Sequence, residues 1–165
     1  MKRIKTYILS ALLLLVVQNS ISNSRQLIKG FDDQDFVCGI QNEVLQQKIM
    51  EWLGTPYKGG SNSLQGTDCS GFVKMIYKEV FNIDLVHSSR EMIKYVKILK
   101  KKSDLKEGDL VFFKIHRRKI SHVGIYLRDG YFVHSSTSNG VEIASLETAY
   151  YRKTYYRGGR VMLSE

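Results

Sequence analysis

Residues 66–80 read GTDCSGFVKMIYKEV, a short polar turn followed at once by an amphipathic stretch. The apolar residues of this stretch recur three or four positions apart, at Phe72, Val73, Ile76 and Val80. That spacing predicts a helix from about 69 to 81 with one apolar face. Thr67 or Asp68 can cap it, because either side-chain oxygen can accept an unpaired backbone N–H. Cys69 is therefore expected in the first turn of a helix.

A cysteine in this position is a candidate nucleophile. The partial positive charge of a helix N-terminus favours the thiolate over the thiol, and the thiolate is the reactive form. The unpaired backbone N–H of Cys69 can also point at an oxyanion. The alternative is a structural, buried cysteine. A disulfide with Cys38 is a further alternative, but Cys38 follows Phe36 and Val37 and resembles a small buried hydrophobe.

Helices are expected first along the chain and strands later. Helices are predicted over about 42–53, 69–81 and 89–97, the last opened by the capping-box sequence of residues 88–91. Strands are predicted over 110–115, 120–127, 131–135, 141–143 and 160–163, with a short helix over 145–151. This order predicts an α+β fold in which N-terminal helices pack on an antiparallel sheet.

Two histidines belong to the predicted hairpin around Arg128-Asp129-Gly130. A two-residue loop would place His122 and His134 on opposite faces of the sheet. A three-residue loop with a left-handed Gly130 would place Gly124 opposite His134, and both histidines on one face. We predict the second register, because Gly124 leaves room for the His134 ring. Cys69 with two histidines would form a nucleophile, a base and an orienting group. A structural role for each histidine and a metal site of all three residues are the alternatives.

The length and the charge set outer limits on function. The chain has 165 residues, which suits one folded domain, and a net charge of +9. Residues 1–24 combine three basic residues, an apolar stretch of 11 residues and small polar residues, the pattern of a signal peptide. The mature chain would then carry +6, which suits an anionic envelope polymer, and we see no nucleic-acid motif. We assign residues 25–41 to an N-terminal segment and 42–165 to the catalytic domain.

Five ordered stretches resemble the NlpC/P60 superfamily of cell-wall cysteine peptidases. They are Gly54-Thr55-Pro56-Tyr57, Asp68-Cys69-Ser70-Gly71-Phe72-Val73, residues 105–113 (LKEGDLVFF), Ser121-His122-Val123-Gly124-Ile125-Tyr126 and Phe132-Val133-His134-Ser135-Ser136. The resemblance covers about residues 43–163. It implies a papain-like core in which a helix carries the cysteine and an antiparallel sheet carries both histidines.

By this resemblance Cys69 is the nucleophile, His122 the base and His134 the third polar member. Tyr57, Asp68 and Ser70 are candidates for contacts to the substrate and the oxyanion, although Asp68 can equally be a helix cap and Tyr57 a packing aromatic. His87 stands where the family often has arginine, and we assign it no role.

The family cleaves peptidoglycan stem peptides at γ-D-glutamyl–diamino acid or D-Ala–diaminopimelate bonds. We therefore expect an exported, monomeric enzyme of the periplasm or cell envelope, without metal, cofactor or stable membrane insertion after signal cleavage. A thiol acyltransferase or amidase with a non-wall substrate and an inactive wall-binding module are the rival functions.

Overall fold

The structure, a computed structural model, describes residues 37, 39–115 and 119–162. The chain divides into two units, residues 1–39 and 40–165, and the second unit contains the helices and the sheet that carry the site. The predicted signal peptide and Cys38 lie outside the described residues. Among the residues described, no helix combines the length and the apolar character needed to cross a bilayer.

The two main helices begin and end where the sequence predicts. Helix α2 (Glu43–Trp52) is capped by the Asn42 side chain, and Gly54 follows it with a positive φ of 79°. Helix α3 (Cys69–Phe81) ends at Asn82, which adopts the left-handed conformation at φ 55°. Both helices bury one face: α2 buries Leu45, Ile49 and Trp52, and α3 buries Phe72, Val73 and Ile76.

A six-stranded sheet follows, with the strand order β3-β8-β4-β5-β6-β7 and antiparallel pairing throughout. Its strands are β3 (Val96–Leu99), β4 (Leu110–Phe113), β5 (His122–Tyr126), β6 (Tyr131–Ser136), β7 (Gly140–Ser145) and β8 (Tyr155–Val161). The smaller elements are β1 (Asn62–Ser63), β2 (Gly66–Thr67), α4 (Ser89–Met92), η1 (Ile93–Tyr95), η2 (Lys102–Asp104) and α5 (Ala149–Thr154). The predicted α+β class is confirmed.

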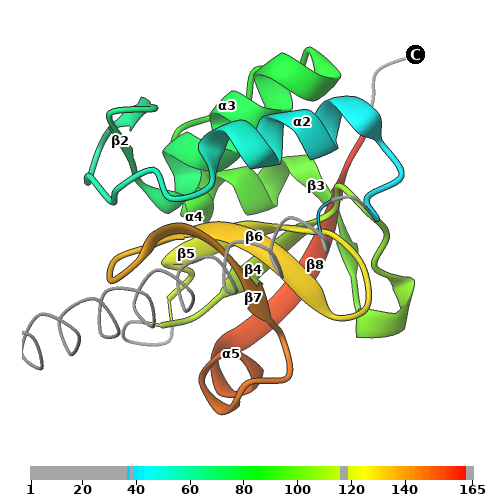
Figure 1. Cartoon of the computed structure of the whole chain (residues 1–165). Coiled ribbons are helices and arrows are strands. Elements are labelled where there is room, and N and C mark those ends of the chain that lie inside the picture. The colour runs from blue at the N-terminus through cyan, green and yellow to red at the C-terminus, as the bar shows by residue number, and fades with distance from the viewer. Residues whose placement is uncertain (1–36, 38, 116–118, 163–165) are drawn as a thin grey trace, which may run out of the picture. The chain divides into compact units, whose positions relative to one another are not determined.

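Both faces of the sheet are covered (Figure 1). Helices α2 and α3 lie on one side, and α5 lies on the other. The apolar alternation of β5 places Val123 and Ile125 on one face, where both are fully buried. On the other face Phe113 and Phe132 belong to a cluster that the tyrosines of α5 and β8 complete. The histidines of the hairpin share this second face.

The predicted third helix is wrong in its second half. Ser88 caps α4 as expected, but the helix ends at Met92, one 3-10 turn follows, and Val96–Leu99 forms the edge strand β3. Its partner is the last strand, with Val96 opposite Val161. The apolar residues that suggest a continued helix therefore belong to a strand, and the residues that pair with it lie about sixty positions further along the chain.

Candidate active site

Cys69 is the first residue of α3, and the segment before it is held in place by several backbone bonds. Tyr57 and Thr67 form an isolated parallel bridge, in which Thr67 N donates to the Pro56 carbonyl over 3.0 Å. Ser135 Oγ also donates to the Thr67 carbonyl over 2.8 Å. Since Ser135 follows His134, this bond ties the strand of the histidines to the segment of the cysteine.

Asp68 is the N-cap of α3. Its Oδ1 accepts from Gly71 N over 2.8 Å and from Ser70 Oγ over 2.9 Å, and its Oδ2 accepts from Gly60 N over 2.7 Å. Burial alone would raise the pKa of the Asp68 carboxyl, but these donors together with His87 lower it. The interpretation of Asp68 as a helix cap is therefore confirmed, and its contact to a substrate stays a prediction. Ser70 is buried and faces Asp68.

The β5–β6 hairpin has the predicted three-residue register. Ile125 pairs with Val133 and Tyr126 with Phe132, which continues to Gly124 opposite His134. Gly130 is left-handed as expected, at φ 82°. A Cβ added at Gly124 would stand 3.1 Å from the His134 Cβ and 2.7 Å from the Phe132 ring. The absence of a side chain at Gly124 thus makes the space that His134 occupies.

The two histidines form a buried, hydrogen-bonded pair. His122 Nε2 lies 2.9 Å from His134 Nδ1, and the rings meet edge to face with their centroids 4.8 Å apart. His122 is 8% exposed and His134 is 1% exposed. Because Nε2 of His122 is taken up by His134, Nδ1 is the ring nitrogen left for Cys69.

Burial keeps all three groups uncharged in the free protein. It raises the pKa of the Cys69 thiol to about 11, against donors from the Val123 and Ser70 backbone that lower it. Burial likewise lowers the pKa of His122 to about 4, and holds the pKa of His134 well below its usual value. The direction for Cys69 is opposite to the one that the helix N-terminus alone predicts, because the desolvation of a buried anion outweighs the partial charge of a helix end.

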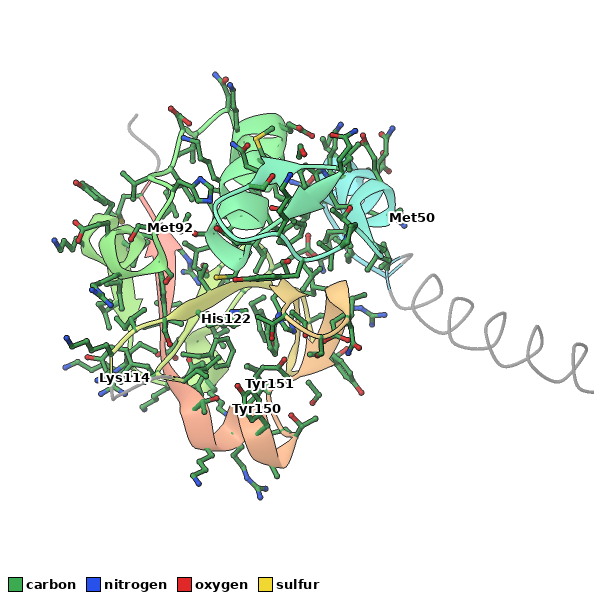
Figure 2. The ribbon with its side chains drawn as sticks, turned by 90° about the vertical axis from the view of Figure 1, so that its left-hand side faces the viewer. Met50, Met92, Lys114, His122, Tyr150 and Tyr151 are labelled. Atoms are coloured by element: carbon green, nitrogen blue, oxygen red, sulfur yellow. The ribbon has the colours of Figure 1, made fainter. Side chains whose placement is uncertain are left out.

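A cavity of about 520 Å³ opens beside the three residues. Cys69, His122, His134 and Tyr57 line it. Most of the remaining lining is polar, from Ser121, Ser136, Thr137, Ser138, Asn139, Glu142, Tyr150 and Tyr151, with Ile115 as the exception. Figure 2 shows Tyr150 and Tyr151 of α5 below the strand that carries His122. The predicted nucleophile, base and third member therefore share one cavity with Tyr57, while Asp68 and Ser70 lie behind it as supports for α3.

Sequence reasoning missed three side chains at the site. His87 Nε2 lies 3.0 Å from Asp68 Oδ1, although 19 positions separate them. Tyr151 Oη lies 3.0 Å from His134 Nε2, and Glu142 Oε1 lies 3.8 Å from the same nitrogen. Glu142 was open to inference, because it is the cross-strand partner of His134 in the β6–β7 pairing. The contact of Tyr151 with His134 could not be inferred from strand pairing, because Tyr151 belongs to the separate helix α5.

Two alternatives that the sequence leaves open bear on this site. Cys69 is a free cysteine, and Cys38, its possible disulfide partner, falls outside the described residues. Within the described part of the chain, no group of three or more His, Cys, Asp and Glu side chains is arranged to hold a metal ion.

Comparisons with known proteins identify relatives of this chain. A probable endopeptidase NlpC homolog of Haemophilus influenzae is 43% identical over 121 residues, which cover 73% of this chain and 63% of that protein. The murein DD-endopeptidase MepS/murein LD-carboxypeptidase of Escherichia coli is 37% identical over 127 residues, covering 74% of this chain and 66% of that protein. The chain thus spans somewhat less than two thirds of the length of each of these relatives.

A solved structure of an NlpC/P60 family protein from Bacillus cereus superposes with a TM-score of 0.67 at 31% identity. The superposition covers 74% of this chain and 40% of that one. The sequence profile of the NlpC/P60 family itself matches residues 54–160, which contain every residue of the cysteine–histidine site. The chain belongs to the NlpC/P60 family.

Proposed function

We propose that the chain is an exported cysteine endopeptidase that hydrolyses amide bonds in the stem peptides of peptidoglycan. The observation that carries this proposal is the placement of Cys69, at the start of α3, in one cavity with the hydrogen-bonded pair of His122 and His134. A nucleophile, a base and a group that orients the base are the parts that acyl transfer from an amide requires. Relatives named endopeptidases support the same reaction class.

The first half of the reaction forms a thioester. The Cys69 thiol gives its proton to Nδ1 of His122, and its sulfur attacks the carbonyl carbon of the scissile amide. The tetrahedral intermediate then collapses, the C–N bond breaks, and the leaving amine takes the proton from His122. Because Cys69 and His122 both rest uncharged, the thiolate arises by this proton transfer when the substrate is bound, and is not stored in the free enzyme.

The second half restores the enzyme. His122 removes a proton from a water molecule, and the hydroxide attacks the thioester carbonyl. The C–S bond breaks, the sulfur recovers its proton from His122, and the product leaves as a carboxylic acid that ionises in solution. No metal ion or cofactor enters this sequence of steps.

Two groups can stabilise the oxyanion. The backbone N–H of Cys69 lies in the first turn of α3, where helix N–H groups have no partner within the helix. Tyr57 lines the cavity and is 39% exposed. Its partial burial and the neighbouring Cys69 and Asp68 raise the pKa of the Tyr57 hydroxyl, so it stays protonated and can donate.

The polar lining of the cavity favours a peptide over a lipid or another apolar acyl substrate. Hydroxyl and amide side chains of residues 136–139 contribute to this lining. Since the relative from Escherichia coli is named a DD-endopeptidase, we propose the D-Ala–diaminopimelate crosslink as the scissile bond, with the γ-D-glutamyl–diamino acid bond as the alternative. The predicted signal peptide over 1–24, and the charge of +6 that remains once its three basic residues are removed, suit an anionic wall polymer in the envelope.

Digestion of purified peptidoglycan tests the proposal. The full chain and its Cys69→Ala variant are incubated with the polymer, and the soluble products are identified by mass spectrometry. Products from the wild type alone would establish the hydrolase, and their masses would name the bond. Products from neither protein would refute the peptidoglycan substrate. In that case, hydrolysis of other amides by the wild type but not by Cys69→Ala would indicate an amidase for another substrate. Binding of both proteins to the polymer without cleavage of any amide would indicate an inactive binding module.

A further inference from the structure

Two side chains lie beside the outer ring nitrogen of His134, one at hydrogen-bond distance and one at ion-pair distance, and the proposed mechanism has not used them. Tyr151 Oη lies 3.0 Å from His134 Nε2. Glu142 Oε1 lies 3.8 Å from the same nitrogen, and Asn139 Nδ2 donates to the other carboxylate oxygen over 2.8 Å. Glu142 is directly opposite His134 in the β6–β7 ladder, so the two side chains share a face of the sheet.

The chain of hydrogen bonds can run in two directions, and only one suits catalysis. In the first, Nε2–H of His122 donates to Nδ1 of His134, whose own Nε2–H points at Tyr151. Nδ1 of His122 is then an open acceptor. In the second, Nδ1–H of His134 donates to His122, which must carry its proton on Nδ1. A neutral imidazole protonated at Nδ1 has no acceptor there for the Cys69 proton.

The chemistry of the two groups beside His134 Nε2 favours the first direction. A carboxylate accepts hydrogen bonds and cannot donate them, and its negative charge favours a proton on the nearest ring nitrogen. The Tyr151 oxygen can accept that proton as a hydrogen bond while its own hydroxyl proton points elsewhere. Phe132 stacks on the His134 ring at a centroid distance of 4.9 Å and prevents the ring from turning away.

We propose that Tyr151 and Glu142 are positioning residues which set the direction of the His134–His122 hydrogen bond, and so keep Nδ1 of His122 open for the Cys69 proton. The inference rests on the proposed cysteine hydrolase mechanism. Neither residue touches the reacting atoms. The imidazolium that forms when His122 takes the proton is also stabilised, through His134, by the negative charge of Glu142.

The sharpest test replaces the carboxylate by an amide. In Glu142→Gln the new side chain can keep its oxygen on Asn139 and turn its NH₂ group toward His134, which would make Nε2 of His134 an acceptor and reverse the chain. The readout is ¹⁵N NMR of the imidazole nitrogens in the resting full chain, where protonated and unprotonated nitrogens differ strongly in shift. We expect His122 protonated on Nε2 in the wild type and on Nδ1 in the variant. Glu147→Gln, which alters an exposed partner of Lys102, is the matched control.

Kinetics on the peptidoglycan substrate give a second readout. Tyr151→Phe is expected to lower kcat about tenfold and Glu142→Gln about a hundredfold, with KM little changed in both. Tyr155→Phe is the matched control for the tyrosine. Tyr155 also packs on Phe113, but among the described residues its buried hydroxyl has no hydrogen-bond partner. The Tyr155→Phe variant should keep the wild-type kcat.

The outcomes separate the two proposals. A wild-type His122 protonated on Nδ1, or the same tautomer in the wild type and in Glu142→Gln, would overturn the positioning role whatever the activity. If Tyr151→Phe has the same kcat as Tyr155→Phe, Tyr151 has no positioning role. If the wild type cuts no peptidoglycan but the tautomers shift as expected, the proposed function fails and the positioning role stands.

Discussion

Acidification should destabilise this protein at a pH where most proteins are unaffected, because His122 and His134 are buried without charge. A histidine whose pKa is lowered by folding binds fewer protons in the folded state than in the unfolded chain. The stability it contributes is complete above the unfolded pKa of 6.5 and is lost as the pH falls toward the folded pKa. For His122 the window runs from pH 6.5 to about 4.

The magnitude follows from the width of that window. One pKa unit corresponds to about 1.36 kcal/mol. Between pH 6.5 and pH 5, His122 alone should remove about 2 kcal/mol of the free energy of unfolding, and about 3 kcal/mol over its whole window. His134 acts in the same direction. Asp68 does too, since its pKa is lowered by folding, but only below its ordinary value of 3.8, so the range from pH 6.5 to 5 reports on the histidines.

Urea denaturation at pH 7, 6.5 and 5 measures the effect, with Trp52 as the reporter. Trp52 is the single tryptophan of the chain, is 2% exposed, and lies edge-on to Phe72 in the core between α2 and α3. The comparison variant is His122→Gln, which removes one titrating ring. We expect the wild type to lose about 2 kcal/mol more than this variant between pH 6.5 and 5.

Parallel loss of stability in the two proteins would refute the reasoning. It would show that His122 takes up a proton in the folded protein near its ordinary pKa, and that water or a charged partner solvates the pair. The conclusion that Cys69 and His122 rest uncharged would then be wrong. The proposed order of proton transfer depends on that conclusion.

Two further predictions concern single contacts in the fold, and a third concerns the pH dependence of activity. Gly124→Ala should cost about 1–3 kcal/mol of stability in urea denaturation and lower kcat, because the added Cβ would stand 2.7 Å from an aromatic ring and 2.8 Å from a carbonyl of β6; unchanged stability would contradict this packing. Arg160→Met should cost about 3 kcal/mol, because it leaves Asp109, which is 3% exposed, as a buried carboxylate without the guanidinium 2.7 Å away; a loss below 1 kcal/mol in the same assay would argue against that pairing. The pH profile of kcat/KM should be flat from about pH 5 to 10, falling below that range as His122 protonates and above it as Cys69 ionises; a basic limb near pH 8.5 would instead indicate a resting thiolate–imidazolium pair.

Local sequence patterns predicted much of the site. The spacing of apolar residues and the polar turn before Cys69 located the start of α3, because helix caps and amphipathic faces depend on neighbours a few positions away. The register of the β5–β6 hairpin could also be predicted from the sequence. The three-residue loop and Gly124 together left one alignment in which both histidines share a face.

Other features were decided by contacts between distant parts of the chain. Val96–Leu99 is a strand because β8 pairs with it, although its local pattern continues a helix. His87 reaches Asp68, and Tyr151 reaches His134, only because the sheet and its covering helices bring these segments together. Local sequence patterns do not predict contacts between residues that are this far apart in the chain.

The sequence by itself determined that Cys69 begins a helix and which face of the hairpin carries the histidines, since a helix start and a strand register are set by a few consecutive residues. The tertiary structure alone decided the electrostatics of the site. It buried Cys69 and both histidines deeply enough to hold them uncharged, where the helix N-terminus by itself favours a thiolate. The physical reason is that desolvation depends on every atom that excludes water from a group, and those atoms come from all over the fold.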